Sequence, residues 1–267
     1  MGGRNRPYGI RLQGRSHLSP IALFDSGAGG IGVLREVVKL LPREQFLYFG
    51  DAANAPYGER PIGEVRRLVF AHAERLLAKA KALVIACNTA TAVAAEELRR
   101  RYPDRIIVGM EPALRPAALC RPFPRVLVLA TAATLHERKF AELMQKCAET
   151  ARVLPLAAPE IVTLVERGLA DSPEMRRYLA HLLAPLRADP PDAVVLGCTH
   201  FPFAKRAIAE ALGGDILFFD GAAGTARQLA RRLHEAGLLA PAQAAGGVRI
   251  TASDPTKLPL YRALFWG

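Results

Sequence analysis

Two apolar segments that end in the same way constrain the fold more than any other feature of the chain. The segment Leu83–Ala90 reads LVIACNTA, and the segment Ala193–His200 reads AVVLGCTH. A short apolar run that stops at polar residues is typical of a buried parallel strand at its carboxyl end. Ligands bind at that edge of open α/β sheets. The two segments therefore predict two strands that carry Cys87 and Cys198 to a binding edge.

The rest of the chain repeats this order of short apolar strands and amphipathic helices. We expect strands at 21–24, 46–50, 83–86 and 106–109, and the pattern then restarts with strands at 126–130, 152–155, 193–196 and 216–219. Helical spacing of apolar residues between them predicts helices, among them one at 61–80 and one at 134–149. The sequence thus predicts two similar doubly wound α/β domains with mainly parallel sheets, facing a shared cleft about a pseudo-twofold axis.

The restart of the pattern also suggests where the chain divides. Residues 20–112 and 221–267 form the predicted first domain, which carries Cys87, and residues 113–220 form the second, which carries Cys198. This division requires a late strand near residue 250 to return to the first sheet. Residues 1–19 are basic and lack the apolar core of a secretory signal, so we expect a mobile leader.

The net charge of +11 does not by itself indicate a nucleic-acid partner. Lys and Arg are spread over the predicted helices instead of forming one stripe interleaved with aromatic residues. The positive field would attract a small anionic substrate. No apolar run approaches the roughly 20 residues that span a bilayer, so no membrane association is expected.

The four cysteines indicate free thiols. Cys87, Cys120, Cys147 and Cys198 show no C-x-x-C motif and no short spacing. This pattern matches neither a disulfide framework nor a zinc site, so we expect no metal and a cytoplasmic location. Cys120 and Cys147 resemble ordinary core cysteines.

A glycine-rich loop offers a different interpretation of the first domain. Gly27-x-Gly29-x-x-Gly32 matches the dinucleotide fingerprint, and Asp51 ends the next strand, where an acid that binds ribose belongs. An NAD-dependent oxidoreductase is therefore an alternative. Asp25 argues against it, because a carboxylate two residues before the loop would repel a pyrophosphate by about 1–4 kcal/mol. The loop amides suit a smaller anion such as a substrate carboxylate.

Two thiols on opposite sides of a cleft could serve as paired acid and base catalysts. Inverting a carbon that bears a weakly acidic hydrogen requires one group to remove a proton and another to deliver one to the opposite face. A thiol suits both roles, because its ordinary pKa of about 8.5 lies near neutrality. Asp25 could assist Cys87, and His200 could assist Cys198. A disulfide between Cys87 and Cys198, or two structural core cysteines, are the alternatives.

Four motifs, in order, resemble those of glutamate racemase, within the aspartate/glutamate racemase superfamily. They are Phe24-Asp25-Ser26-Gly27-x-Gly29-Gly30, Gly50-Asp51 with Pro56-Tyr57-Gly58, Ala86-Cys87-Asn88-Thr89-Ala90 and Gly197-Cys198-Thr199-His200-Phe201-Pro202. The resemblance covers most of residues 21–235. The chain departs from the family pattern at Ala158-Pro159, where Cys-Pro is usual, and at Glu137 and Phe140, where Ser and Tyr are usual.

The resemblance implies cofactor-independent interconversion of L- and D-glutamate, with D-glutamate supplied to peptidoglycan, by a homodimer. Cys87 would act on D-glutamate with help from Asp25, and Cys198 on L-glutamate with help from His200 and Glu166. The residues expected to bind substrate are Asp25, Ser26, Tyr57, Gly58, Asn88, Thr89, Thr131, Thr134, Thr199 and His200. An aspartate or other amino-acid racemase remains an alternative, as does a non-catalytic two-lobed amino-acid-binding protein.

Overall fold

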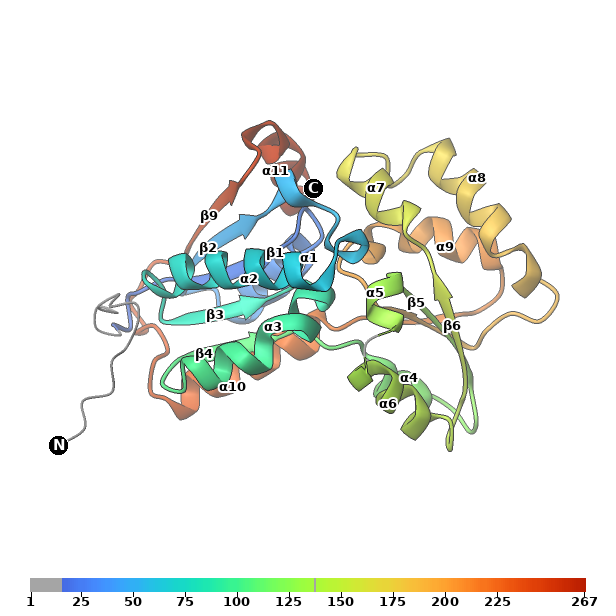
Figure 1. Ribbon diagram of the computed structural model, residues 1–267, viewed down its shortest axis with the longest axis horizontal. Helices are drawn as coiled ribbons and strands as arrows, with labels where there is room; N and C mark the ends of the chain where they lie inside the picture. Colours follow the sequence, from blue (N-terminus) through green and yellow to red (C-terminus); the bar gives the residue numbers. More distant parts are fainter. Residues whose placement is uncertain (1–15, 137) are drawn as a thin grey trace.

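Two parallel β-sheets organise the chain, as the sequence predicts. The computed structural model describes residues 16–136 and 138–267, and Figure 1 shows the two sheets side by side with helices packed around each. Residues 1–15 of the predicted leader, and Glu137, lie outside the described residues. Within the described part of the chain, no helix has the length and apolar character needed to cross a membrane.

The first sheet has the strand order β4-β3-β1-β2-β9, and all its neighbouring strands are parallel. Its strands are β1 (Ile21–Asp25), β2 (Gln45–Gly50), β3 (Ala82–Ile85), β4 (Ile106–Gly109) and β9 (Gly247–Ala252). The expected late strand therefore does return to this sheet, beside β2. Phe24 pairs with both Phe49 and Ile85, so β1 and β3 end at the same level of the sheet.

The second sheet has the order β6-β5-β7-β8 and is also parallel throughout. Its strands are β5 (Arg125–Ala130), β6 (Arg152–Ala157), β7 (Ala193–Leu196) and β8 (Leu217–Phe219). Leu129 pairs with Leu196, so β5 and β7 also end together. In each sheet, the polar residues that follow two neighbouring strands therefore meet at one edge.

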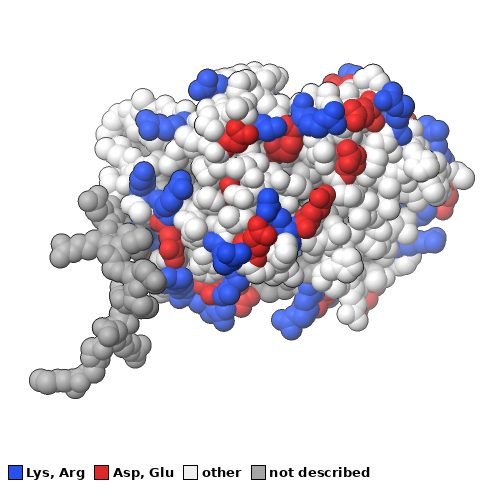
Figure 2. Space-filling model, turned by 45° about the horizontal axis from the view of Figure 1, so that its top comes forward, with Lys and Arg blue, Asp and Glu red and all other residues white. Residues whose placement is uncertain are grey.

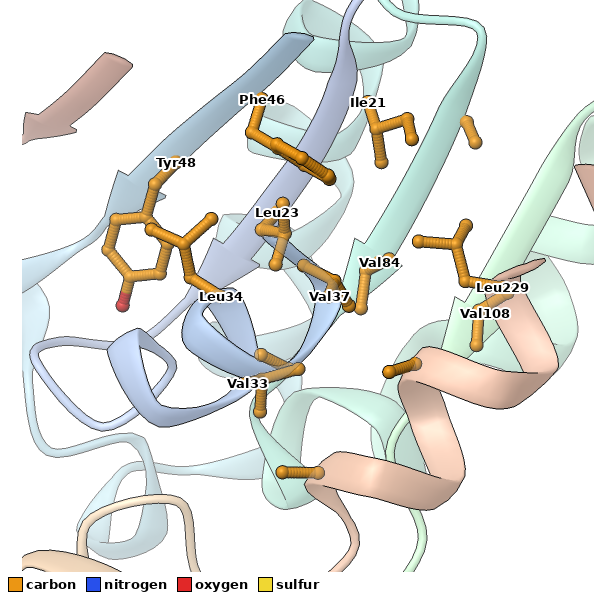
Figure 3. Close-up of a cluster of buried hydrophobic side chains, with 14 of the residues drawn as sticks. Ile21, Leu23, Val33, Leu34, Val37, Phe46, Tyr48, Val84, Val108 and Leu229 are labelled. Carbon is orange, nitrogen blue, oxygen red and sulfur yellow. The ribbon is translucent and has the colours of Figure 1, made fainter. Parts of the chain in front are cut away.

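Helices cover both faces of the first sheet. They are α1 (Ile31–Leu40), α10 (Ala222–Glu235) and α11 (Leu258–Trp266) on one face and α2 (Ile62–Leu77) and α3 (Asn88–Arg101) on the other. Successive strand residues point to opposite faces, so Leu23 packs under α1 while Phe24 packs under α2. Figure 3 shows Val37 of α1 and Leu229 of α10 meeting Val84 of the sheet. Burial on both faces explains why these strands are apolar throughout.

The second sheet is covered in the same manner. Helices α4 (Leu114–Ala118), α5 (Ala132–Leu135) and α6 (Arg138–Cys147) lie on one face, and α7 (Glu160–Glu166), α8 (Pro173–Leu182) and α9 (Lys205–Leu212) lie on the other. Short 3-10 turns complete the chain at Ala52–Asn54, Tyr57–Glu59, Ala184–Leu186, Phe201–Ala204 and Pro255–Lys257. Ser172 caps α8 by accepting a hydrogen bond from the Met175 amide, as its position before a proline suggests.

Four helices differ from the prediction. The single helix expected at 134–149 is instead α5 followed by α6, and Phe140 of α6 is buried in the core. Helices α4 and α11 were not expected, because α4 has only five residues and includes Pro116, while α11 is apolar on several sides and shows no clear period.

The packing of these helices supports the predicted domain boundaries, which we propose at 112/113 and 220/221. Helix α10 packs against α1 and β4 of the first sheet, while α4 packs against β5, β7 and β8 of the second.

Cys147 is buried and Cys120 half-buried in the core under the second sheet, and all four cysteines are free. On the face drawn in Figure 2, Lys and Arg are interspersed with Asp and Glu and form no basic stripe.

A fully buried ion pair ties four segments together at the amino-terminal edge of the first sheet. Lys81 Nζ lies 2.6 Å from Glu44 Oε2, and the two side chains are 0% and 2% exposed. The same ammonium donates to the backbone oxygens of His17 and Leu238. Glu44 Oε1 accepts a hydrogen bond from the Ala240 amide. Such a pair is costly to break because the remaining charge stays buried.

Replacing Lys81 by Met therefore lowers the free energy of unfolding by about 3–5 kcal/mol, the usual cost of leaving one buried charge unpaired. Urea unfolding followed by circular dichroism measures the loss. Lys79→Met is the matched control, because Lys79 is exposed two residues away, and its midpoint stays at the wild-type value. A Lys81→Met midpoint equal to that of the control contradicts this account of the pair.

Candidate functional site

A pocket lies where the carboxyl ends of the two sheets face each other. It encloses about 300 Å³ of space not filled by protein atoms, part of it open to solvent. Its lining comes from both domains: Ser26, Pro56, Tyr57, Gly58, Cys87, Asn88, Thr89, Thr131, Thr134, Val162, Gly197, Cys198, Thr199 and His200. Both strand-end thiols thus line one pocket, as the sequence predicts.

The predicted substrate-binding residues line this pocket, with the exception of Asp25. Asp25 and Glu166 lie behind the lining, where they contact residues that reach it. Pro56, Gly197 and Val162 line the pocket but were not predicted. Pro56 and Gly197 belong to motifs that point to the site, whereas Val162 belongs to an ordinary apolar helix pattern and gives no signal.

Cys87 is the N-cap residue of α3, two positions after the end of β3. Its sulfur accepts a hydrogen bond from the Ala90 amide at 3.5 Å, so the thiol caps the helix. Burial and, after it, the negative charge of Asp25 raise the pKa of Cys87 to about 12, although the Ala90 amide and then Ser26 act in the opposite direction. At neutral pH the Cys87 side chain therefore carries its proton.

Asp25 ends β1 and is fully buried. Its Oδ1 accepts a hydrogen bond from the Gly27 amide at 2.9 Å, and the Thr199 hydroxyl donates to Oδ2 at 3.1 Å. Burial raises the pKa of Asp25, and the nearby His200 and these hydrogen bonds only partly offset it. Asp25 accepts its hydrogen bonds from Gly27 and Thr199, and it acts on Cys87 through its charge.

Cys198 belongs to a row of three polar side chains that continues through His200 to Glu166. Its sulfur lies 3.7 Å from His200 Nδ1, and His200 Nε2 lies 2.7 Å from Glu166 Oε1. Burial disfavours a charged imidazole, but the hydrogen bonds to Cys198 and Glu166 outweigh burial and raise the pKa of His200 well above its ordinary value. Burial likewise opposes the charge of Glu166, but the contact with His200 lowers its pKa. The pair is therefore an imidazolium beside a carboxylate.

Glu166 also connects the two domains. It ends α7 of the second domain, yet its Oε1 accepts a hydrogen bond from the Ala28 amide of the first domain at 2.6 Å. Its Oε2 is buried without a hydrogen-bond partner among the described residues. The carboxylate that orients His200 is thus fixed by the glycine-rich loop across the interface.

The loop needs glycines because side chains of the second domain lie very close to its backbone. A Cβ at Gly27 would lie within 1.9 Å of Glu166 Oε1, and one at Gly29 within 2.3 Å of Thr199 Oγ1. The Gly27 and Ala28 amides already donate to carboxylates. These side chains and their negative charges occupy the place of a pyrophosphate, which disfavours the dinucleotide interpretation.

Asp51 has a different role from the ribose contact of that interpretation. It is fully buried and accepts hydrogen bonds from the Tyr57 hydroxyl at 2.7 Å and from Asn54 Nδ2 at 3.0 Å, while His72 Nε2 lies 3.0 Å away. Burial acts to raise the pKa of Asp51, but these contacts dominate and hold it well below its usual range. Asp51 therefore anchors the loop that carries Tyr57 to the pocket.

A line of hydroxyl groups crosses the pocket wall from one domain to the other. Thr89 Oγ1 lies 3.4 Å from Thr131 Oγ1, which lies 3.0 Å from Thr134 Oγ1. The side-chain oxygen of Asn88 is buried without a hydrogen-bond partner among the described residues. The wall thus offers hydroxyl donors for a carboxylate and a free carbonyl oxygen for an ammonium group.

Comparison with known proteins identifies relatives over most of the chain. Residues 33–229 match the family model described as Asp/Glu/Hydantoin racemase. A glutamate racemase from Clostridium kluyveri is 49% identical over 216 residues, which cover 80% of this chain and 84% of the relative. One from Clostridium acetobutylicum is 42% identical over 236 residues, covering 88% and 92% respectively.

Solved structures show the same architecture. The glutamate racemase of Thermus thermophilus in complex with β-chloro-D-alanine superposes with a TM-score of 0.75 at 37% identity, covering 94% of this chain and 93% of that one. The Escherichia coli glutamate racemase in complex with L-glutamate and the activator UDP-MurNAc-Ala superposes with a TM-score of 0.80 at 32% identity, covering 92% and 95%.

The close contacts of the glycine-rich loop predict which of its glycines can be replaced by alanine without loss of stability. Gly29→Ala places a methyl group against Thr199 and lowers the free energy of unfolding by about 1–3 kcal/mol, the usual cost of overpacking. Gly32→Ala is tolerated, because the nearest atom to its added Cβ is 4.0 Å away. Chemical denaturation of both variants tests this, and equal losses would argue against the contact explanation.

Proposed function

The chain belongs to the Asp/Glu/hydantoin racemase family, and from that premise we propose that it interconverts L- and D-glutamate. The observation that carries the proposal is that Cys87 and Cys198 both line one pocket, each at the end of a strand from a different domain. The proposed catalytic residues are Cys87, Cys198, Asp25, His200 and Glu166.

In the proposed reaction, L-glutamate binds with its α-carbon between the two sulfur atoms. Cys198 as a thiolate takes the α-proton, and the thiol of Cys87 delivers its own proton to the opposite face of the carbon. The product is D-glutamate. Cys198 then holds a proton, and Cys87 is a thiolate. The reverse sequence converts D-glutamate to L-glutamate, so neither direction consumes a co-reactant.

The charges around the two sulfur atoms support this assignment of roles. Cys87 is protonated at neutral pH, because burial and Asp25 raise its pKa. On the other side of the pocket, His200 Nδ1 lies 3.7 Å from the sulfur of Cys198, so the imidazole is next to the proposed base. The proposed acid for the conversion of L-glutamate therefore lies on the Cys87 side, and the proposed base lies on the Cys198 side.

The polar wall of the pocket suits an amino acid. The hydroxyl groups of Thr89, Thr131 and Thr134, with the amino-terminal end of α3, suit carboxylate groups, and the free oxygen of Asn88 suits the ammonium group. Side chains in the pocket lining proposed to bind substrate are Ser26, Tyr57, Asn88, Thr89, Thr131, Thr134, Thr199 and His200, with Asp25 behind them and Gly58 in the loop. Aspartate, the other amino acid in the family description, is the competing substrate.

We propose further that the enzyme needs no cofactor, since the two thiols supply both proton transfers. The family resemblance supports a role in supplying D-glutamate to peptidoglycan and a homodimeric assembly. The four free cysteines support a reducing compartment such as the cytoplasm.

Substitution of either pocket cysteine tests the two-thiol mechanism. Cys87→Ser and Cys198→Ser each lower kcat by about 10²–10⁴-fold, the range expected for loss of a positioned acid or base. Circular dichroism follows the racemisation of each enantiomer. Cys120→Ser, outside the pocket, keeps the wild-type rate. Near-normal turnover by either pocket variant would rule out the mechanism.

Hydrogen exchange tests the reaction class and the substrate. In deuterated water, without added cofactor, the wild-type protein incorporates deuterium at the α-carbon of glutamate during racemisation and exchanges aspartate more slowly. NMR measures the loss of the α-proton signal. A binding protein leaves the signal unchanged, and a faster exchange of aspartate would assign the activity to that amino acid.

A further inference from the structure

The carboxyl-terminal segment reaches the site from outside the span matched by the family model, which ends at residue 229. Lys257 lies at the end of a 3-10 turn before α11, and its Nζ donates to the backbone oxygen of Glu166 at 3.0 Å. We propose that Lys257 is a positioning residue that holds Glu166 and His200 in line with Cys198. This inference rests on the proposed function for its catalytic readout.

The contact is made at a point where α7 needs support. Glu166 is the last residue of α7, so its carbonyl is one of those that a helix leaves without an internal partner. A cation at this end also interacts favourably with the helix dipole. The backbone after it turns at Gly168, which has a φ of +76° and lies against Leu260 of α11. Lys257 and Leu260 together fix the end of α7.

The position of this helix end matters because the Glu166 carboxylate has little freedom. Its Oε1 serves both the Ala28 amide and the His200 ring, and both contacts are 2.7 Å or shorter. A shift of the helix end would lengthen at least one of them and tilt the imidazole away from Cys198. The charge of Lys257 also adds to the effect of His200 in lowering the pKa of Glu166 against its burial.

The segment that carries Lys257 is itself firmly attached to the first domain. Strand β9 pairs with β2 along its whole length, from Gly247 to Ala252. The Ala53 amide donates to Ser253 Oγ at 2.9 Å, and Tyr261 is fully buried against Gly50. Lys257 therefore acts across the domain interface from a rigid base, as Ala28 does on the other side of Glu166.

If Lys257 positions the groups around Cys198, its loss changes the deuterium isotope effects of the two reaction directions in opposite ways. If proton transfer at Cys198 slows, removal of the α-hydrogen from L-glutamate becomes more rate-limiting, so the primary deuterium isotope effect with α-deuterated L-glutamate rises. With α-deuterated D-glutamate, the intermediate formed at Cys87 returns to D-glutamate more often, so the effect falls. General damage to the fold has no reason to move the two isotope effects in opposite directions.

The experiment compares the wild type with three variants. Lys257→Met removes the donor and the charge, Lys257→Arg keeps both, and Arg167→Met is the matched control. Arg167 follows Glu166 directly, but its side chain is exposed and pairs with Glu174. We expect Lys257→Met to lower kcat about tenfold, as a small displacement of a catalytic group does, with the opposed change in isotope effects. Lys257→Arg restores most of the rate, and Arg167→Met behaves as the wild type.

A second measurement does not depend on turnover. The proton on His200 Nε2 that faces Glu166 gives a downfield resonance in ¹H NMR, which Lys257→Met shifts or broadens and Arg167→Met leaves in place. The inference is overturned if Lys257→Met has the same turnover, the same isotope effects and the same His200 resonance as the wild type. A wild-type protein that does not racemise glutamate overturns the proposed function instead, and the NMR comparison still decides the role of Lys257.

Discussion

The carboxylate of Glu166 joins the two domains beside the pocket. It belongs to the second domain, but it accepts a hydrogen bond from the Ala28 amide of the first domain while it contacts His200. The glycine-rich loop must come very close for this bond to form, which is why a Cβ is excluded at Gly27 and Gly29. The orientation of the imidazole beside Cys198 thus depends on both domains being in contact.

The two sides of the pocket are similar in backbone but different in charge. Each thiol follows a buried parallel strand, yet Cys87 faces the charge of Asp25 while Cys198 faces a protonated imidazole. Burial raises the pKa of Cys87, whereas at His200 it opposes the charge that the hydrogen bonds to Cys198 and Glu166 favour. The two thiols of one pocket therefore have different electrostatic surroundings, a carboxylate near Cys87 and an imidazolium near Cys198.

The sequence was informative wherever local chemistry decided the outcome. Apolar strands that end in polar residues placed Cys87, Asn88 and Thr199 correctly at the pocket, because the sheet geometry leaves little choice at a strand end. The role of Asp51 was not foreseen, because its partners come together only in three dimensions. Lys257 gave no signal either, since its contact joins the carboxyl terminus to a helix end 91 positions earlier. Helix α11 was missed because apolar residues on several sides obscure the helical period.

The burial of the two thiols bears on the chemical durability of the protein. Cys87 is 6% and Cys198 8% exposed, and both line the pocket that they share. Oxidation of cysteine requires an accessible thiolate, and the irreversible steps begin once peroxide reaches it. A ligand bound in the pocket would block that approach, so an occupied pocket would slow the oxidation of both sulfur atoms.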